Sequence, residues 1–274
     1  MKSVLKEALG RALARCSPAL AGAVANGDPH ALASRRGRLI RHAQLQQAVR
    51  TRNWTGLRRG LTTYWQGTPG DQFYDAYPER FDQWFLQHHY PLVNALCAEA
   101  VRGSYTRLYE IGCGNGRVLA HLAEQMPDIT QFTGLDVNPS IIERNRATYA
   151  ALPRLSFACA DAAEWLPAHA QSGSILLTYG GVLEYFAPDE LQHLFRLWAD
   201  RFAPSTVALV EPLDPAFDAS NETTSRAGGL ECSFSHPYRR MLEAAGFTIR
   251  FEQEVRIEHR WIMLLATRAS AGQP

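Results

Sequence analysis

Three glycines at alternate positions, Gly112, Gly114 and Gly116, separate a short apolar run that ends at Ile111 from a segment with helical periodicity. Glycine permits a tight backbone turn and removes the side chain that would keep a ligand away from the main chain. A strand, such a turn and a helix in this order are typical of a nucleotide-binding unit. The turn alone is a weak signal, because it also forms where no ligand binds.

Two acids near the turn make the prediction more specific. Glu110 stands directly before the turn, and Asp136 ends the next strand-like run. A carboxylate in the second position accepts hydrogen bonds from both hydroxyls of a ribose. The turn and Asp136 together therefore predict an adenosine ligand.

Charge indicates which adenosine ligand is expected. A dinucleotide turn of the GxGxxG type would have glycine at position 117, where this chain has Arg117. Glu110 would repel a pyrophosphate, but it favours a ligand with a positive end. S-adenosylmethionine carries an ammonium and a sulfonium and no phosphate, so it is the expected cofactor, and NAD and ATP are not.

These features resemble those of the class I S-adenosylmethionine-dependent methyltransferase family, over residues 107–268. The segment from Glu110 to Gly116 resembles the family's first motif, and Asp136 resembles its ribose-binding acid. The resemblance implies that Asp161 and Ala162 contact the adenine edge, although Asp161 also suits a helix N-cap. It further implies that residues 178–181 open toward the transferable methyl group. The expected cofactor-binding residues are Tyr74, Glu110, Gly112, Cys113, Gly114, Asn115, Gly116, Asp136, Val137, Asp161, Ala162, Thr178 and Tyr179.

The elements that position these residues are strands that alternate with amphipathic helices from Arg107 onward, which indicates a parallel sheet with crossover helices. We expect an α/β fold with a doubly wound, seven-stranded, mostly parallel sheet, and the resemblance implies that the last strand is antiparallel. The expected strands are residues 107–111, 131–136, 155–159, 174–179, 206–211, 247–252 and 261–267. Residues 212–233 are expected to form an irregular loop able to reach a substrate. A last helix should follow, capped by Ser235 and ended by Gly246.

Helical periodicity predicts a helical N-terminal extension over residues 1–104 that covers the substrate, and residues 105–274 then form the methyltransferase domain. An aromatic cluster in the extension either closes over the cofactor or packs in the core. Its members are Tyr64, Trp65, Phe73, Tyr74, Tyr77 and Phe81.

Catalytic residues are harder to predict, because methyl transfer depends mostly on proximity and needs a general base only for weakly acidic acceptors. Glu184 and Tyr185 follow the fourth strand, and His236 follows the substrate loop. The alternatives are structural roles: Glu184 as a solvated or loop-bonded carboxylate, Tyr185 as a lid or core aromatic, and His236 as an exposed histidine. Cys113 is expected as a small residue of the turn rather than a nucleophile.

The expected acceptor follows from motifs that the chain lacks. Residues 178–181 read Thr-Tyr-Gly-Gly, without the Asn/Asp-Pro-Pro-aromatic sequence of exocyclic-amine nucleic-acid methyltransferases. Lysines occur only at positions 2 and 6, and Glu184 has no second glutamate in its own loop, as protein-arginine methyltransferases have. By elimination we expect methylation of an oxygen or nitrogen of a small organic molecule, as in secondary metabolism. An RNA-modifying methyltransferase and a non-catalytic S-adenosylmethionine-binding protein are the alternatives.

The charge is unevenly distributed along the chain. Residues 1–60 contain twelve basic residues and two acids, whereas the whole chain has a formal charge of only +1. We expect these basic helices to dock on the acidic remainder, within one subunit or across a homodimer, rather than on nucleic acid. Scattered cysteines predict no metal site, and charges interrupt every apolar run, so no membrane segment and a cytoplasmic location are expected.

Overall fold

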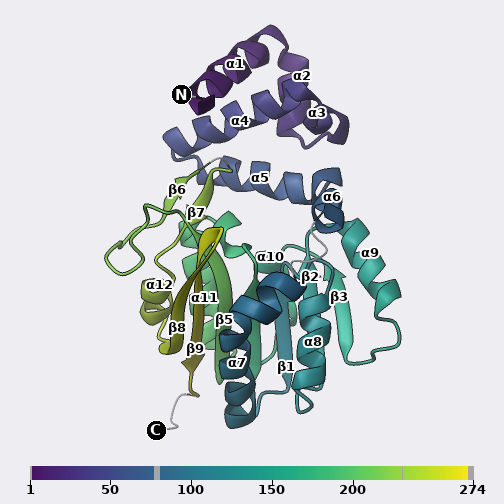
Figure 1. Cartoon of the computed structure of the whole chain (residues 1–274), viewed down its shortest axis with the longest axis vertical. Helices are drawn as coiled ribbons and strands as arrows, with labels where there is room; N and C mark the ends of the chain where they lie inside the picture. Colours follow the sequence, from purple (N-terminus) through teal and green to yellow (C-terminus); the bar gives the residue numbers. More distant parts are fainter. Residues whose placement is uncertain (1, 77–80, 230, 271–274) are drawn as a thin grey trace.

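A seven-stranded sheet forms the centre of the computed structural model, which describes residues 2–76, 81–229 and 231–270 (Figure 1). Its order is β3-β2-β1-β4-β5-β9-β8. The strands are β1 (Arg107–Ile111), β2 (Gln131–Asp136), β3 (Leu155–Cys159), β4 (Ser174–Tyr179), β5 (Ser205–Leu213), β8 (Thr248–Ile257) and β9 (His259–Arg268). β1 to β5 pair in parallel, and β9 lies antiparallel between β5 and β8. The predicted sheet and its antiparallel strand are confirmed.

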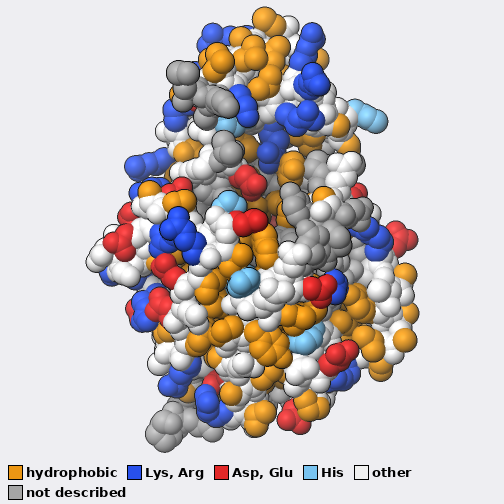
Figure 2. Space-filling model, viewed as in Figure 1, with side chains coloured by type: hydrophobic (Ala, Val, Ile, Leu, Met, Phe, Trp, Pro, Cys, Tyr) orange, Lys and Arg blue, Asp and Glu red, His pale blue; other side chains and the backbone are white. Residues whose placement is uncertain are grey.

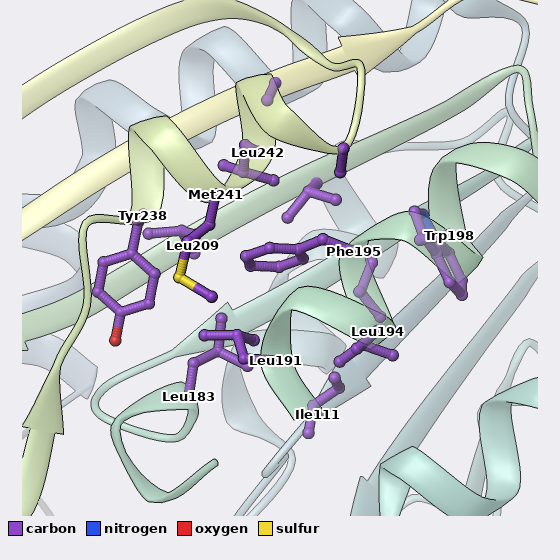
Figure 3. Close-up of a cluster of buried hydrophobic side chains, with 14 of the residues drawn as sticks. Ile111, Leu183, Leu191, Leu194, Phe195, Trp198, Leu209, Tyr238, Met241 and Leu242 are labelled. Carbon is purple, nitrogen blue, oxygen red and sulfur yellow. The ribbon is translucent and has the colours of Figure 1, made fainter. Parts of the chain in front are cut away.

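Helices cover both faces of this sheet. Leu108 and Tyr109 of β1 point to opposite faces, as successive strand residues must, and each joins a different apolar core. One core contains α7 (Tyr90–Gly103), α8 (Arg117–Gln125) and α9 (Pro139–Thr148), and the other contains α10 (Ala162–His169), α11 (Pro188–Arg201) and α12 (Tyr238–Ala244). Figure 3 shows the second core, where Phe195 of α11 lies near Met241 and Leu242 of α12. The arrangement is doubly wound.

The N-terminal helices form a separate layer beyond the carboxyl ends of the parallel strands (Figure 1). They are α1 (Lys2–Cys16), α2 (Pro18–Ala25), α3 (Pro29–Ala33), α4 (Arg35–Arg50), α5 (Trp54–Trp65) and α6 (Thr68–Ala76). The π-helix η1 (Phe81–His89) follows this layer, and its residue Phe85 belongs to the core that contains α7 and α8. Side-chain caps fix three of the helix starts, because Asp28, Ser34 and Asn53 each accept a hydrogen bond from the backbone N–H three residues later. Lys and Arg side chains gather on this layer (Figure 2). The division of the chain between residues 104 and 105 stays a prediction.

The segment predicted as an irregular loop contains a small hairpin. β6 (Arg226–Gly228) pairs antiparallel with β7 (Ser233–Ser235), and Phe234 packs with Leu57 and Leu61 of α5. The prediction that Ser235 caps the last helix was wrong: Ser235 ends β7, and its hydroxyl accepts a hydrogen bond from the Asp214 amide. α12 begins at Tyr238 without a side-chain cap, and Gly246, with φ of +88°, follows its end as predicted.

No helix in the described ranges is both long and apolar enough to cross a membrane.

Candidate functional site

A cavity of about 860 Å³ lies where the carboxyl ends of the parallel strands face the N-terminal layer. Its floor comes from the loops after β1, β2, β4 and β5, and its roof from α5, α6 and η1. Crevices at the carboxyl ends of parallel strands are the usual ligand sites of doubly wound folds. The volume is at the upper end of the range for small-molecule sites, so it has room for a cofactor and an acceptor together.

The glycine turn forms one wall of the cavity. Gly112 has φ of +68°, and a Cβ atom on it would lie 2.5 Å from the side chain of Val182. Gly116 has φ of +72°, and a Cβ atom there would meet Tyr149 at 2.8 Å. Both positions therefore require glycine for conformation and for space. Gly116 is the N-cap of α8 and lies behind the wall rather than in it.

Glu110 presents a buried and incompletely bonded carboxylate to the cavity. It is 1% exposed, and its Oε2 atom has no hydrogen-bond partner among the described residues. Burial, and then the nearby charge of Asp136, raise the pKa of Glu110 well above its ordinary value. A buried acid without a partner is costly, and a ligand ammonium would supply both a charge and donors. The residue fits the amino-acid end of S-adenosylmethionine.

Asp136 is held in place by two backbone amides. Its carboxylate accepts hydrogen bonds from Gly114 N and Asn138 N, both at 3.0 Å. These bonds lower the pKa of Asp136, but burial outweighs them and raises it. Each carboxylate oxygen keeps a further acceptor site, which suits the two ribose hydroxyls.

Asp161 combines the predicted N-cap with an unpredicted ion pair. It accepts a hydrogen bond from Ala163 N at 3.0 Å, and the guanidinium of Arg58 on α5 lies 2.8 Å from its carboxylate. Arg58 also pairs with Glu190 at 2.5 Å and lies over the ring of Phe186. The roof is thus fastened by charge to the region predicted for the adenine.

Most of the predicted cofactor residues meet at this cavity. Those in its wall are Glu110, Gly112, Cys113, Gly114, Asn115, Asp136, Val137, Asp161, Ala162 and Tyr179. The side chain of Tyr74, like Tyr77, lies outside what the structure describes. Burial raises the pKa of the Cys113 thiol well above its usual range, which agrees with a structural residue rather than a nucleophile. The cofactor-binding roles of these residues remain predictions.

Thr178 is not in the cavity wall, and its neighbour Glu211 explains why. Thr178 is fully buried and donates its hydroxyl proton to Glu211 at 2.9 Å. Glu211, at the end of β5, also accepts hydrogen bonds from the backbone amides of residues 182, 183 and 184. Burial raises the pKa of Glu211 to about 7, against the effect of these donors. Glu211 thereby fixes the loop after β4.

That loop places both Glu184 and Tyr185 in the cavity wall, within the short 3₁₀ helix η2 (Leu183–Tyr185). Burial raises the pKa of Glu184 to about 8; a hydrogen bond with Ser233 opposes the shift, and the charges of Glu211 and Glu231 add to it. Tyr185 donates its hydroxyl proton to Glu231 at 3.2 Å. A catalytic role for either residue stays a prediction.

The structure does not bring His236 to the cavity. In the β7 segment Ser233 and Ser235 face the cavity, so Phe234 and His236 point the other way, as strand alternation requires. His236 is fully buried, its Nδ1 lies 2.7 Å from the hydroxyl of Ser225, and burial lowers its pKa to about 3. Because His236 does not line the cavity, it is not placed to act as a base on an acceptor bound there.

Three members of the aromatic cluster of the extension line the cavity, and Tyr64 does not. Trp65, Phe73 and Phe81 line the cavity, whereas Tyr64 lies against the guanidinium of Arg41 at 4.4 Å. Trp65 lies 5.7 Å from Tyr185, ring centroid to ring centroid.

Sequence reasoning missed four residues of the site: Arg58, Glu211, Glu231 and Ser233. Each acts through a partner far away along the chain, so local patterns do not indicate them. The alternation of Ser233, Phe234 and Ser235 is the one local signal, because it is typical of a short half-buried strand.

The sheet order, the inserted antiparallel strand and the glycine turn define the fold of a class I S-adenosylmethionine-dependent methyltransferase. Residues 108–205 match the family described as methyltransferase domain. This part of the chain is therefore a class I methyltransferase domain.

The relatives are more specific but cover less of the chain. Trans-aconitate 2-methyltransferase of Methylobacterium radiotolerans is 38% identical over 105 residues, which cover 38% of this chain and 37% of that protein. The enzyme of the same name from Streptomyces coelicolor is 36% identical over 125 residues, or 44% of this chain and 38% of that protein. The chain thus matches less than two fifths of the length of these curated relatives.

Solved structures share the fold at low identity. Magnesium protoporphyrin IX methyltransferase from Synechocystis PCC 6803, with bound S-adenosylmethionine, has a TM-score of 0.54 and 14% identity, covering 77% of this chain and 97% of that one. The [4+2]-cyclase SpnF has a TM-score of 0.51 and 16% identity, covering 65% of this chain and 80% of that one. A cyclase among these structures means that the fold alone does not specify the reaction.

Proposed function

We propose that this protein transfers a methyl group from S-adenosylmethionine to a nitrogen or oxygen of a small organic molecule. The observation that carries the proposal is the single cavity lined both by Glu110 and Asp136 and, beyond β4, by Glu184. A cofactor and an acceptor in one chamber are held in the proximity that in-line displacement requires.

Some of these residues bind the cofactor, and others position the side chains that act on the acceptor. Glu110 binds the ammonium of the cofactor, Asp136 binds its ribose, and Asp161 lies beside its adenine. When bound, the sulfonium supplies an electrophilic methyl group. Glu211 holds the loop that carries Glu184, and Glu184 accepts the proton that the acceptor loses. Trp65 and Phe73 in the roof exclude water from the chamber.

Calorimetry with S-adenosylmethionine, S-adenosylhomocysteine and NAD tests the cofactor assignment. We expect the first two to bind and NAD not to bind, because the wall offers acids where a pyrophosphate would lie. Tight binding of NAD without binding of S-adenosylmethionine would contradict the proposal. Transfer of a labelled methyl group to small metabolites in an extract then separates an enzyme from a binding protein.

The RNA alternative receives less support, because the basic segment is partly neutralised within the chain. Arg58 has two acidic partners, Asp161 and Glu190, and Arg50 and Arg11 both pair with Glu7. These arginines are not free to bind phosphates without loss of an existing ion pair.

A further inference from the structure

Acidic side chains dominate the end of the cavity away from the glycine turn, which we call the acceptor end. This end lies over β4, β5 and β9, whereas the turn and Asp136 lie over β1 and β2. Its wall residues with a carboxylate, guanidinium or imidazole group are Glu184, Asp214, Arg226, Glu231, Glu258 and His259.

The arginines of the described cavity wall already have carboxylate partners. Arg58 pairs with Asp161 and Glu190. Arg226 lies 3.4 Å from Glu222 and 4.0 Å from Asp214, and it stacks over Phe217 at 5.6 Å. A substrate carboxylate would therefore compete with existing partners and face the remaining acids, which disfavours polyanions.

Glu184 and Glu231 come together from different parts of the chain. The hairpin residue Ser233 bonds Glu184, and Tyr185 donates to Glu231 at 3.2 Å. The nearby guanidinium of Arg41 offsets part of the Glu231 charge, but it donates to the Gly60 carbonyl and lies over Tyr64. The two glutamates thus remain available to a cation in the cavity.

Aromatic faces adjoin these acids. Trp65 and Tyr185 both line the cavity, with their ring centroids 5.7 Å apart. Aromatic faces and carboxylates together form a site for an organic ammonium.

Building on the proposed function, we infer that the acceptor is a small amine that enters as an ammonium recognised by Glu184 and Glu231, and not a polycarboxylate. The relatives' name does not oppose this inference. Their matches span 105 and 125 residues, whereas the cavity wall draws on residues from Arg58 to Trp261, so no such match covers the whole wall.

The proposed transfer moves one proton and one methyl group. An ammonium beside Glu184 favours the ionised form of this carboxyl group, whose pKa burial raises in the ligand-free protein. The ammonium then gives one proton to the Glu184 carboxylate, which leaves a neutral amine with a free lone pair. That lone pair forms the N–C bond while the S–C bond breaks, and the electron pair of the broken bond stays on sulfur. The methylated nitrogen is again cationic and remains beside Glu231. Glu184 then loses its proton to water.

Matched pairs of compounds test the inference on the full chain. The probes are benzylamine and benzoate, phenethylamine and phenylpropionate, tyramine and 4-hydroxyphenylpropionate, and putrescine and succinate, together with trans-aconitate. Each is incubated with labelled S-adenosylmethionine, and its binding to the protein saturated with S-adenosylhomocysteine is measured by calorimetry. We expect label and binding among the amines only.

The outcomes separate the two proposals. Labelling of trans-aconitate or of another carboxylate, or labelling of neither class while S-adenosylhomocysteine still binds, would overturn the amine assignment. Failure of S-adenosylhomocysteine and S-adenosylmethionine to bind would instead overturn the proposed function.

Glu231→Gln gives a second test, because Glu231 is an exposed residue of the cavity wall and its replacement preserves shape. Affinity for the amine that binds best should fall at least roughly tenfold, since a charge-assisted hydrogen bond is lost. Affinity for S-adenosylhomocysteine should not change. Glu124→Gln, on the exposed side of α8, is the matched control. Equal amine affinity in the two variants would mean that Glu231 does not bind the amine.

Discussion

The guanidinium of Arg58 on α5 lies 2.8 Å from the carboxylate of Asp161 at the start of α10, across 103 residues of sequence. Both side chains are shielded, with exposed fractions of 16% and 27%. The same guanidinium pairs with Glu190 at the start of α11. One residue of the basic extension thereby fastens the roof of the cavity to two helices of the methyltransferase domain.

Arg58→Leu should destabilise the protein by about 1–3 kcal/mol, because it leaves Asp161 and Glu190 partly buried without their cation. Urea unfolding measures this loss, and limited proteolysis between α4 and α5 should become faster. Arg36→Ala, an exposed arginine of α4, is the control and should change neither property. Unchanged stability in Arg58→Leu would mean that the roof is held by apolar contacts alone.

Asp136→Ala should weaken S-adenosylhomocysteine binding at least roughly tenfold, because up to two charge-assisted hydrogen bonds to ribose are lost. From the sequence, little effect on stability is expected. The structure leads to another expectation, because the amides of Gly114 and Asn138 would lose their acceptor. Asp136→Asn, which keeps one acceptor oxygen, should lose less stability in thermal unfolding. An unchanged dissociation constant in both variants would contradict the ribose assignment.

Glu211→Gln should reduce methyl transfer at least roughly tenfold while cofactor affinity changes little. The amide retains one acceptor oxygen, but its NH₂ group would face backbone N–H donors of residues 182–184. Steady-state kinetics and calorimetry together test this split. Thr178→Val removes a single donor to Glu211 and should have a smaller effect in the same direction. A loss of cofactor binding equal to the loss of turnover would argue against a positioning role.

Glu184 should make the protein less stable as pH rises. Its pKa of about 8 in the folded protein lies above the ordinary value of 4.5, so the folded protein binds more protons than the unfolded chain between these pH values. The free energy of unfolding therefore falls from about pH 4.5 to about pH 8 through this group. Glu211 likewise lowers the free energy of unfolding as pH rises, whereas His236 raises it. The contribution of Glu184 must therefore be measured as a difference between a variant and the wild type.

Glu184→Gln isolates this contribution. Thermal unfolding of the ligand-free protein at pH 5 and pH 8 should show a smaller decrease in melting temperature for the variant than for the wild type. Glu124→Gln should behave as the wild type. If all three proteins show the same decrease, Glu184 is ionised in the folded state at neutral pH.

Bulk tRNA should not bind tightly through the N-terminal region. A titration at about 50 and 200 mM salt spans the interval over which several phosphate contacts cost orders of magnitude in affinity. Tight, salt-sensitive binding that disappears on deletion of residues 1–60 would favour the RNA alternative. Absence of binding at both salt concentrations, with loss of methyl transfer on deletion, would support a cover for a small acceptor.

The position of the predicted cofactor residues around one cavity could be anticipated because the residues of the turn are neighbours in the sequence. Gly112 and Glu110 belong to one strand and turn, and their spacing indicates a ligand before any tertiary contact is known. The strands of the sheet could be predicted because short apolar runs of strand length alternate with amphipathic helices. The acceptor half depends instead on contacts between distant segments, such as Tyr185 with Glu231 and Arg58 with Asp161. The periodic patterns that indicate helices and strands carry no information about such long-range pairs.

The position of β9 beside β5 has a consequence for how the chain folds during synthesis. β5 pairs with β4 on one side and, on the other, only with β9, which is made after α12 and β8. Until residues 259–268 have left the ribosome, β5 presents a long apolar edge with unpaired backbone groups, which is a template for association with other chains. Chains that stop before β9 should therefore aggregate rather than accumulate as a smaller folded domain.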